Sequence, residues 1–174
     1  MAIADSDDGL HRPRPASRPP GDLTTMKPFA LLRNLVLLAA RLGLGIVLIA
    51  HGWQKFTEWG IDGTTASFEA MGVPLRALSA WFAALVELGG GIALVVGFAV
   101  PIVGVLVAFV MAGAWAIVHS GSGLFVSDGG FEFVLVIIVA ALLLAVTGAG
   151  AFGIDRFLSP LVLRNARGRV PADA

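Results

Sequence analysis

The sequence contains no cysteine among its 174 residues. This absence excludes disulfides, iron–sulfur clusters, c-type haem attachment, thiolate zinc sites and any thiol or persulfide intermediate on this chain. Phosphate loops, dinucleotide fingerprints and a Ser/His/Asp set are also missing, because the glycine-rich segments lie inside apolar runs rather than at strand-to-helix turns. Nucleic acid is not an expected partner, since nothing beyond a short basic tail would favour it.

Charged residues are scarce. Asp, Glu, Lys and Arg make up 14% of the chain and cancel to a formal net charge of zero, whereas ordinary soluble domains carry about 25% charged residues. Hydrophobic residues make up 57% of the chain. A soluble globule of this size has too little interior to bury so much apolar surface. The composition therefore predicts an integral membrane protein of one domain, with the lipid bilayer as its first partner.

The two ends of the chain differ from the middle. Residues 1–28 are rich in Pro, Arg and Asp and lack an apolar run, which predicts a disordered leader rather than a signal peptide. Residues 29–160 form the predicted membrane domain, and residues 161–174 form a basic cytoplasmic tail. Apolar and charged residues alternate just before that tail, so this segment is expected to lie along the membrane interface. Met26 is an alternative start to Met1.

Four apolar runs occupy the middle of the chain. They cover residues 31–56, 75–98, 100–118 and 131–147. Each is close to the roughly 20 residues that cross about 30 Å of hydrocarbon as a helix. Helix is also favoured because backbone groups in lipid must bond within their own segment. The sequence predicts an all-α, four-helix membrane bundle, with a buried hairpin as the alternative for the second and third runs.

The segments that join the apolar runs carry recognisable sequence signals. Residues 57–74 are long enough to carry a short helix of their own. Residues 97–100 form a tight joint, and Pro101 follows where a helix can begin without the missing N–H. Residues 120–130 are rich in Gly and Ser, which is typical of a turn.

Basic and acidic residues lie on opposite sides of the predicted bundle. Arginines and lysines precede the first run and follow the fourth, whereas the loops between are acidic. The positive-inside rule then predicts both termini in the cytoplasm and the protein in the cell membrane. The four tryptophans fall near the outer interface, as an aromatic belt or as the lining of a pocket. They are Trp53, Trp59, Trp81 and Trp115.

Two ionisable residues are expected deep in the membrane. Arg41 lies in the first run and Glu87 in the second, at depths that differ by roughly 5 Å at about 1.5 Å of rise per residue. Unpaired charges in hydrocarbon are costly. The sequence predicts an Arg41–Glu87 ion pair, either as a structural clasp or with Glu87 exchanging protons.

A second polar group is expected nearer the outer surface. His51 and Lys55 share one face of the first helix, His119 ends the third run and Glu132 opens the fourth. Imidazole and carboxylate groups can transfer protons near neutral pH. Each residue has the alternative of simply reaching interfacial water. Haem is disfavoured, because the one histidine pair on two helices, His51 and His119, lies near the surface. A non-haem iron or copper site at His51, His119 and Glu132 is equally disfavoured, and no metal is expected.

Small residues recur along the predicted helices. Gly104, Ala108 and Ala112 are spaced by four, and residues 89–91 are all glycine. Such positions let helices approach closely. The contacts could lie inside one bundle or between copies, so a homo-oligomer stays open.

The order of motifs resembles the DoxX family of small four-helix membrane proteins over about residues 29–160. The segments that carry the resemblance are RLGLGIVLIAHGWQKF (41–56), ELGGGIALVVG (87–97), HSGSGLFVSDGGFE (119–132) and TGAGAFGID (147–155). Arg41, Gly52 and Lys55 match the first family helix, and Glu87 with its glycines matches the second. The resemblance implies a link to a quinone-linked respiratory oxidoreductase, and to thiol and oxidative-stress defence beside soluble redox enzymes.

The functional hypothesis is a membrane subunit of a quinone-linked redox system. The quinone head group is expected among His51, Lys55, His119 and Glu132, with Glu87 as a further proton-exchanging residue. Arg41, Trp53, Trp81 and Trp115 are the expected binding residues around the quinone. The other half-reaction must then lie on a soluble redox enzyme or a second membrane subunit. A non-catalytic scaffold for such an enzyme is the alternative, and a solute or proton pathway along Glu87 is a third.

Overall fold

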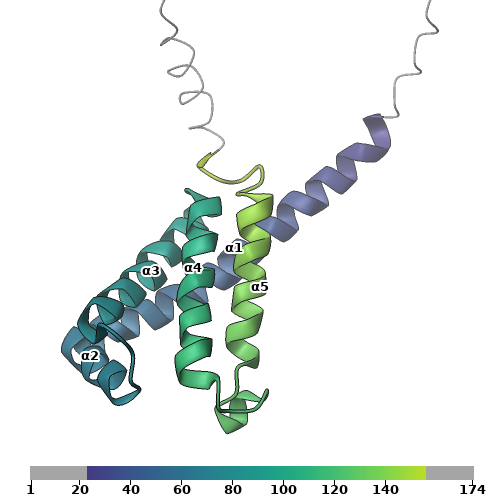
Figure 1. The fold of residues 1–174 in the computed structure, drawn as a ribbon. Coiled ribbons are helices and arrows are strands. Elements are labelled where there is room, and N and C mark those ends of the chain that lie inside the picture. Colours follow the sequence, from purple (N-terminus) through teal and green to yellow (C-terminus); the bar gives the residue numbers. More distant parts are fainter. Residues whose placement is uncertain (1–22, 156–174) are drawn as a thin grey trace, which may run out of the picture.

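The computed structural model describes the backbone of residues 23–155 and the side chains from Pro28 onward. Over this range the chain is helical and contains no strand, so the alternative of a buried hairpin is wrong. Figure 1 shows the arrangement of the helices. The elements are α1 (Leu23–Thr57), α2 (Gly60–Ala70), α3 (Arg76–Val96), α4 (Val100–Ala114), the π-helix η1 (Trp115–His119), the 3-10 helix η2 (Val126–Asp128) and α5 (Glu132–Thr147).

All four apolar runs are helices, and residues 57–74 carry the short helix α2 as expected. Three helices are long and apolar enough to cross a membrane: Pro28–Thr57, Arg76–Val96 and Val100–His119. The fourth run forms the shorter apolar helix α5, with 16 residues. The structure therefore confirms the all-helical class over the described residues, in which three helices are candidate membrane spans.

Helix α1 begins earlier than expected. Its backbone is helical from Leu23, inside the segment predicted to be a disordered leader. Extending an existing helix costs far less than starting one, so the apolar run after Pro28 can carry helix into the preceding polar residues. The rest of the leader, the predicted interfacial segment beyond Asp155 and the basic tail lie outside the described residues.

Glycines bring α1 and α3 into backbone contact. A Cβ placed on Gly52 would lie 2.7 Å from the Cα of Leu88, and one on Gly91 would lie 2.8 Å from the amide nitrogen of Ile49. Both distances are shorter than any real Cβ contact. Close approach of this kind supplies packing where the solvent is as apolar as the side chains. Several of the small residues in the sequence therefore act inside one bundle.

Helices α4 and α5 form a second close pair. A Cβ on Gly104 would lie 2.5 Å from the carbonyl oxygen of Ala141. The two pairs, α1 with α3 and α4 with α5, contact each other less extensively than their own members do. Buried aliphatic residues fill the space where the pairs meet, among them Leu48, Leu94 and Val107.

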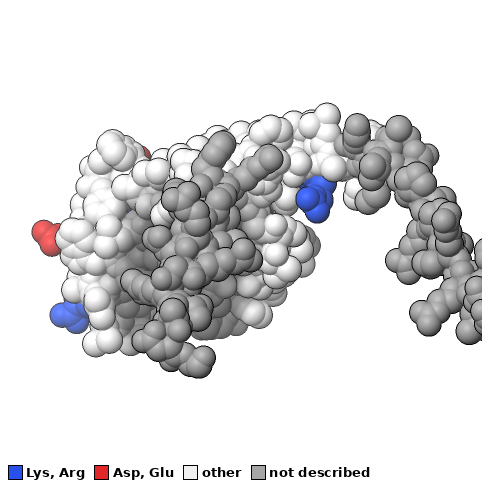
Figure 2. All heavy atoms as spheres, turned by 90° about the horizontal axis from the view of Figure 1, so that it is seen from above, with Lys and Arg blue, Asp and Glu red and all other residues white. Residues whose placement is uncertain are grey.

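The outside of the bundle is apolar. Large hydrophobic side chains are exposed on every long helix, including Ile46 on α1, Phe109 on α4 and Val146 on α5. Seen from above, the described atoms are free of charged side chains except for a few small patches at the edges (Figure 2). The charged side chains Arg41, Lys55 and Glu87 are instead buried. This distribution is the reverse of a soluble domain and suits a lipid solvent.

Arg41 fastens α1 to the segment that follows α5. Its guanidinium donates to the carbonyl oxygens of Ala149 and Phe152, the latter at 3.3 Å. The predicted Arg41–Glu87 ion pair is therefore wrong. Counting residues from each helix start placed the two at similar depths, but the contact register of α1 and α3 sets Arg41 against Gly97, at the end of α3.

Asp155 caps the start of α4 from the far end of the described chain. Its carboxylate accepts hydrogen bonds from the backbone N–H groups of Ala99, at 2.8 Å, and Val100, at 3.2 Å. Its own N–H donates to the carbonyl oxygen of Gly97. The side chain thus satisfies two of the donors that a helix start leaves free. Pro101 occupies the first turn of α4, as expected.

We expect Gly52→Ala to destabilise the bundle, because the new methyl group would collide with the backbone of Leu88. Overpacking of this kind costs about 1–3 kcal/mol. The measurement is the thermal unfolding midpoint of the purified protein in detergent. Gly43→Ala is the matched control on the same helix, since nothing lies within 4 Å of its added Cβ. Equal midpoints for the two variants would contradict the tight α1–α3 contact.

We expect Asp155→Ala to lower the free energy of unfolding by about 0.5–2 kcal/mol, the usual value of a helix cap. Asp155→Asn should lose less, because its amide oxygen can still accept one of the two hydrogen bonds. Both are read from the same unfolding midpoint, with the exposed Asp62→Ala as control. No difference between Asp155→Ala and Asp62→Ala would show that the cap contributes nothing.

Candidate functional site

The most deeply buried charges that face each other are Lys55 and Glu87. The Lys55 ammonium nitrogen lies 2.6 Å from a carboxylate oxygen of Glu87, and the two residues are 9% and 5% exposed. Lys55 comes from α1 and Glu87 from α3. The glycine contact between Gly52 and Leu88 lies beside them and sets the register that brings the two side chains together.

Helix α2 covers the Lys55 end of α1. Thr64, which is buried, donates to the carbonyl oxygens of Lys55 at 3.3 Å and Gly60 at 3.0 Å. The Lys55 ammonium also lies 5.9 Å from the centre of the Trp59 ring, within the range of a cation–π contact. The α2 segment therefore shields the ammonium and leaves its side chain directed at Glu87.

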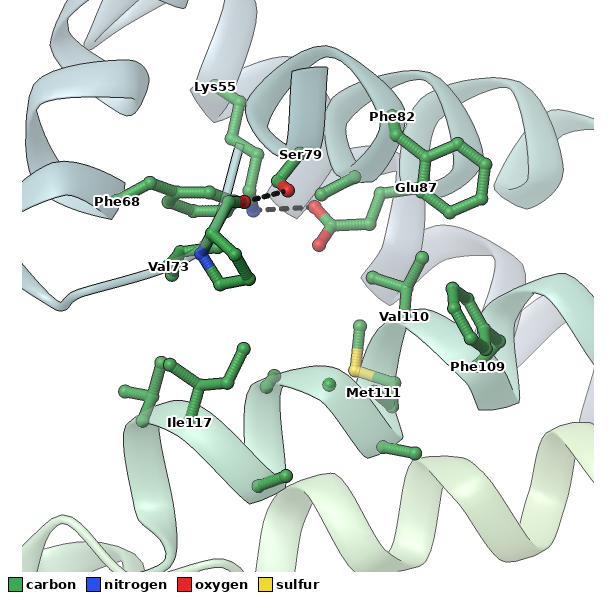
Figure 3. A pocket seen from close by; sticks show the side chains of 17 residues that line it. Lys55, Phe68, Val73, Ser79, Phe82, Glu87, Phe109, Val110, Met111 and Ile117 are labelled. Atoms are coloured by element: carbon green, nitrogen blue, oxygen red, sulfur yellow. Dashed lines mark hydrogen bonds and ion pairs between the residues drawn. The ribbon is translucent and has the colours of Figure 1, made fainter. Parts of the chain in front are cut away.

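The ion pair lies in the wall of a pocket of about 560 Å³. In Figure 3 the Lys55 and Glu87 side chains point toward each other across the top of the pocket, and Ile117 and Met111 line the opposite wall. The lining residues are Lys55, Phe68, Val73, Pro74, Ser79, Phe82, Ala83, Glu87, Phe109, Val110, Met111, Ala112, Gly113, Ala114, Ala116, Ile117 and Val118.

This space stays open for two reasons: two helices diverge, and the side chains between them are small. Helices α3 and α4 are close at the short turn that joins them and diverge toward their other ends (Figure 1). Where they are apart, α4 and η1 present small residues, namely Ala112, Gly113, Ala114 and Ala116, which cannot fill the gap.

The hydroxyl of Ser79 holds the loop before α3 at the rim by donating to the carbonyl oxygen of Pro74 at 2.7 Å. The π-helical turn at Trp115–His119 forms part of this wall, and such turns are frequent at functional sites.

The pocket offers a ligand one hydrogen-bond donor and one hydrogen-bond acceptor, surrounded by apolar side chains. Lys55 offers N–H donors and Glu87 offers carboxylate oxygens, one of which faces away from Lys55 in Figure 3. Their charges cancel. Such a site can hold a polar head by hydrogen bonds, and its two groups can give and take a proton.

The other predicted polar residues lie around the loop before α5. The ring nitrogen Nδ1 of His119 is 2.7 Å from the carbonyl oxygen of Gly129, and Glu132 accepts from the N–H of Val126 at 2.8 Å. His51 is exposed, and its ring contacts Phe133 at a centroid distance of 6.1 Å. The structure thus brings His119 and Glu132 to one loop and sets His51 beside the start of α5, while Lys55 turns toward Glu87 instead.

The predicted aromatic binding residues do not line the pocket. Trp53 and Trp81 are about half exposed, and Trp81 packs edge-on against Phe56. Trp115 lies 5.3 Å from the ring of Phe131, on the side of the 120–131 loop. Arg41 holds the chain after α5, as described above. In residues 28–155, no three His, Cys, Asp or Glu side chains gather closely enough to hold a metal ion.

Sequence reasoning missed most of the pocket lining. Phe82, Phe109 and Met111 lie in apolar runs, where no pattern separates lipid-facing from cavity-facing positions, and Phe68 lies in the joint at 57–74. One signal was present. The residues 112–116 include three alanines and a glycine beside an aromatic, and of these only Ala112 belongs to the spacing that predicts helix packing.

Comparison with known proteins agrees with this architecture. The DoxX family model matches residues 36–120. The inner membrane protein YqjF of Escherichia coli (strain K12) is 38% identical over 129 residues, which cover 74% of this chain and 95% of YqjF. The inner membrane protein YphA of the same organism is 32% identical over 74% of this chain and 94% of its own length.

A further relative carries a chemical name. CatD of Bacillus subtilis (strain 168), provisionally named an oxidoreductase, is 33% identical over 70% of this chain and 85% of its own length. No solved structure matches the chain. The match to the family model, the near-complete coverage of its relatives and the apolar helical bundle lead to one conclusion: this chain is a membrane protein of the DoxX family.

Proposed function

We propose that the protein is the quinone-binding membrane component of a redox system, and that the pocket beside Lys55 and Glu87 receives the quinone head group. The observation that carries this proposal is a buried ion pair in the wall of a large apolar pocket. The name of the relative CatD points to the same class of chemistry.

The residues present fit such a head group. The pocket volume of about 560 Å³ lies within the range of roughly 300–1,000 Å³ that is usual for small-molecule sites. Its walls are aromatic and aliphatic, with Phe68, Phe82 and Phe109 among them. The polar end offers both a donor and an acceptor, which suits a carbonyl in one redox state and a hydroxyl in the other.

A bound quinone supplies two-electron chemistry coupled to two protons. In this proposal Lys55 donates a hydrogen bond to the head group from its ammonium. Glu87 holds the ammonium in place and exchanges a proton at its second carboxylate oxygen. The apolar walls keep bulk water from the pair, which strengthens both interactions. His119 and Glu132 hold the loop before α5, His51 contacts Phe133 on α5, and none of the three takes a direct part.

The redox partner lies on another protein in this proposal, because the chain has no cysteine to carry a cluster or a reactive thiol. A soluble redox enzyme or a second membrane subunit would supply the electrons. We further propose that α5 completes a fourth crossing of the cell membrane and that both termini are cytoplasmic. The basic residues that precede α1 and follow α5 support this orientation.

Filling the pocket should expel quinone. Gly113 lines the pocket, and nothing lies within 4 Å of a Cβ placed on it. We therefore expect Gly113→Phe to fold and to retain less than about a tenth of the wild-type quinone, a loss of roughly 1.4 kcal/mol or more in binding. The measurement is the quinone extracted from protein purified in mild detergent. The matched control is Gly89→Phe on α3, which also has free space around its Cβ but does not line the pocket.

Two further variants separate this site from others. Glu87→Gln should weaken quinone retention, because it leaves the ammonium of Lys55 buried without its counter-charge. His119→Ala should retain the wild-type amount, since His119 lies outside the pocket lining. Equal quinone in Gly113→Phe and Gly89→Phe would refute the pocket, whereas loss in His119→Ala would move the site to the 120–131 loop. Absence of quinone from the wild type would favour the scaffold alternative.

The proposed orientation has its own test. Reporter proteins fused after residue 174 and before residue 1 should both be active in the form that works only in the cytoplasm. A reporter inserted into the loop at 120–130 should be active only in its exported form. A C-terminal fusion with exported activity would show that α5 does not complete the crossing.

A further inference from the structure

The pocket has a rim on the outer surface of the bundle. Phe82 on α3 and Phe109 on α4 both line it, and they are 39% and 68% exposed. Their rings meet edge to face at a centroid distance of 6.2 Å, across the gap between the two helices. Both residues lie inside candidate membrane spans, Arg76–Val96 and Val100–His119. Surface exposed within a span faces lipid, so the rim between these rings opens toward the bilayer.

The polar end of the pocket carries no net charge. Among the described residues that line the pocket, Lys55 and Glu87 are the two ionisable ones, and each is the partner of the other at 2.6 Å. A ligand that brought a further charge would leave one charge without a counter-charge in a medium of low dielectric. That situation costs several kcal/mol unless a new partner is present. The site therefore discriminates by charge as well as by shape.

We propose that the pocket is entered sideways from the bilayer, between α3 and α4, by an uncharged amphiphile. Its head bonds to Lys55 and Glu87, and its apolar tail leaves past Phe82 and Phe109. The proposal rests on the function proposed above only in using the same pocket, because a quinone is one member of this class and uncharged glycerides and alcohols are others. Lipids with anionic heads are excluded by the cancelled charges.

The test compares two probes with one tail. One is a monoacylglycerol with a photoreactive diazirine in its chain, and the other is an alkylsulfonate with the same diazirine tail and a permanent negative charge. Each is added to the full-length protein in nanodiscs of phosphatidylcholine. After illumination, mass spectrometry identifies the labelled residues. The sulfonate is chosen because its charge does not depend on pH.

We expect the uncharged probe to label the facing sides of α3 and α4 in a saturable way. The sulfonate should label them at least about tenfold less, since an uncompensated buried charge costs more than the 1.4 kcal/mol that this factor represents. Gly113→Phe should abolish the labelling by the uncharged probe. Gly89→Phe should leave it at the wild-type level, because Gly89 does not line the pocket.

A change of charge should reverse the preference. In Glu87→Gln the ammonium of Lys55 has lost its carboxylate, so the ratio of sulfonate to glyceride labelling should rise at least about tenfold. The wild-type ratio and the Gly113→Phe variant still test the proposal should Glu87→Gln fail to fold, because Gly113→Phe keeps the ion pair.

The outcomes separate this inference from the proposed redox function. Equal saturable labelling of the wild-type pocket by both probes would overturn selection by charge, even in a protein that retains quinone. Labelling confined to the loop ends, with none between α3 and α4, would overturn entry from the bilayer. Conversely, labelling as expected in a protein that retains no quinone would leave the inference standing and remove the redox function.

Discussion

The contact between α1 and α3 is the constraint on which the rest of the structure depends. Glycines at positions 45, 52 and 91 let the two backbones touch, which fixes how far one helix can slide along the other. That register sets Lys55 against Glu87 and sets Arg41 against the turn after α3. In lipid, where apolar side chains gain little by meeting each other, such close contact and buried polar bonds hold helices together. The backbone contact thus positions the ion pair, and the ion pair in turn helps to hold the two helices together.

The division of the bundle into two close pairs has a functional consequence. Because α1 packs on α3 and α4 packs on α5, the weaker boundary lies between the two pairs, where α3 faces α4 and α1 faces α5. Arg41 and Asp155 hold that boundary together at one end, through the carbonyl oxygens after α5 and the N–H groups at the start of α4. At the other end small residues leave it open, and there the pocket forms beside the ion pair. One end of the boundary therefore provides stability, and the other end provides space.

The buried ion pair alone would be weak evidence for function, since such pairs also serve to specify one packing arrangement. The position of the pair beside a pocket is what points to a function. The pair faces a pocket of about 560 Å³ rather than a filled core. Two charges that are costly to bury therefore lie where a ligand can form hydrogen bonds with them. Arg41, by contrast, donates to the backbone carbonyl oxygens of Ala149 and Phe152 and fastens α1 to the segment after α5.

The sequence by itself determined that the chain lies in a lipid bilayer, and it determined the helices and the segments that join them. The length of the apolar runs and the demand for internal hydrogen bonds leave few alternatives in lipid. It also marked Glu87 as a charge that needs a partner inside the membrane, whereas Lys55 was expected nearer the outer surface. Only the tertiary structure decided their partners. Depth counted along separate helices paired Glu87 with Arg41, whereas the contact register, which depends on tilt and on which glycines touch, pairs it with Lys55. The pocket was hidden for a similar reason: Phe82 and Phe109 are ordinary members of apolar runs, and only the divergence of two helices makes them neighbours of a cavity.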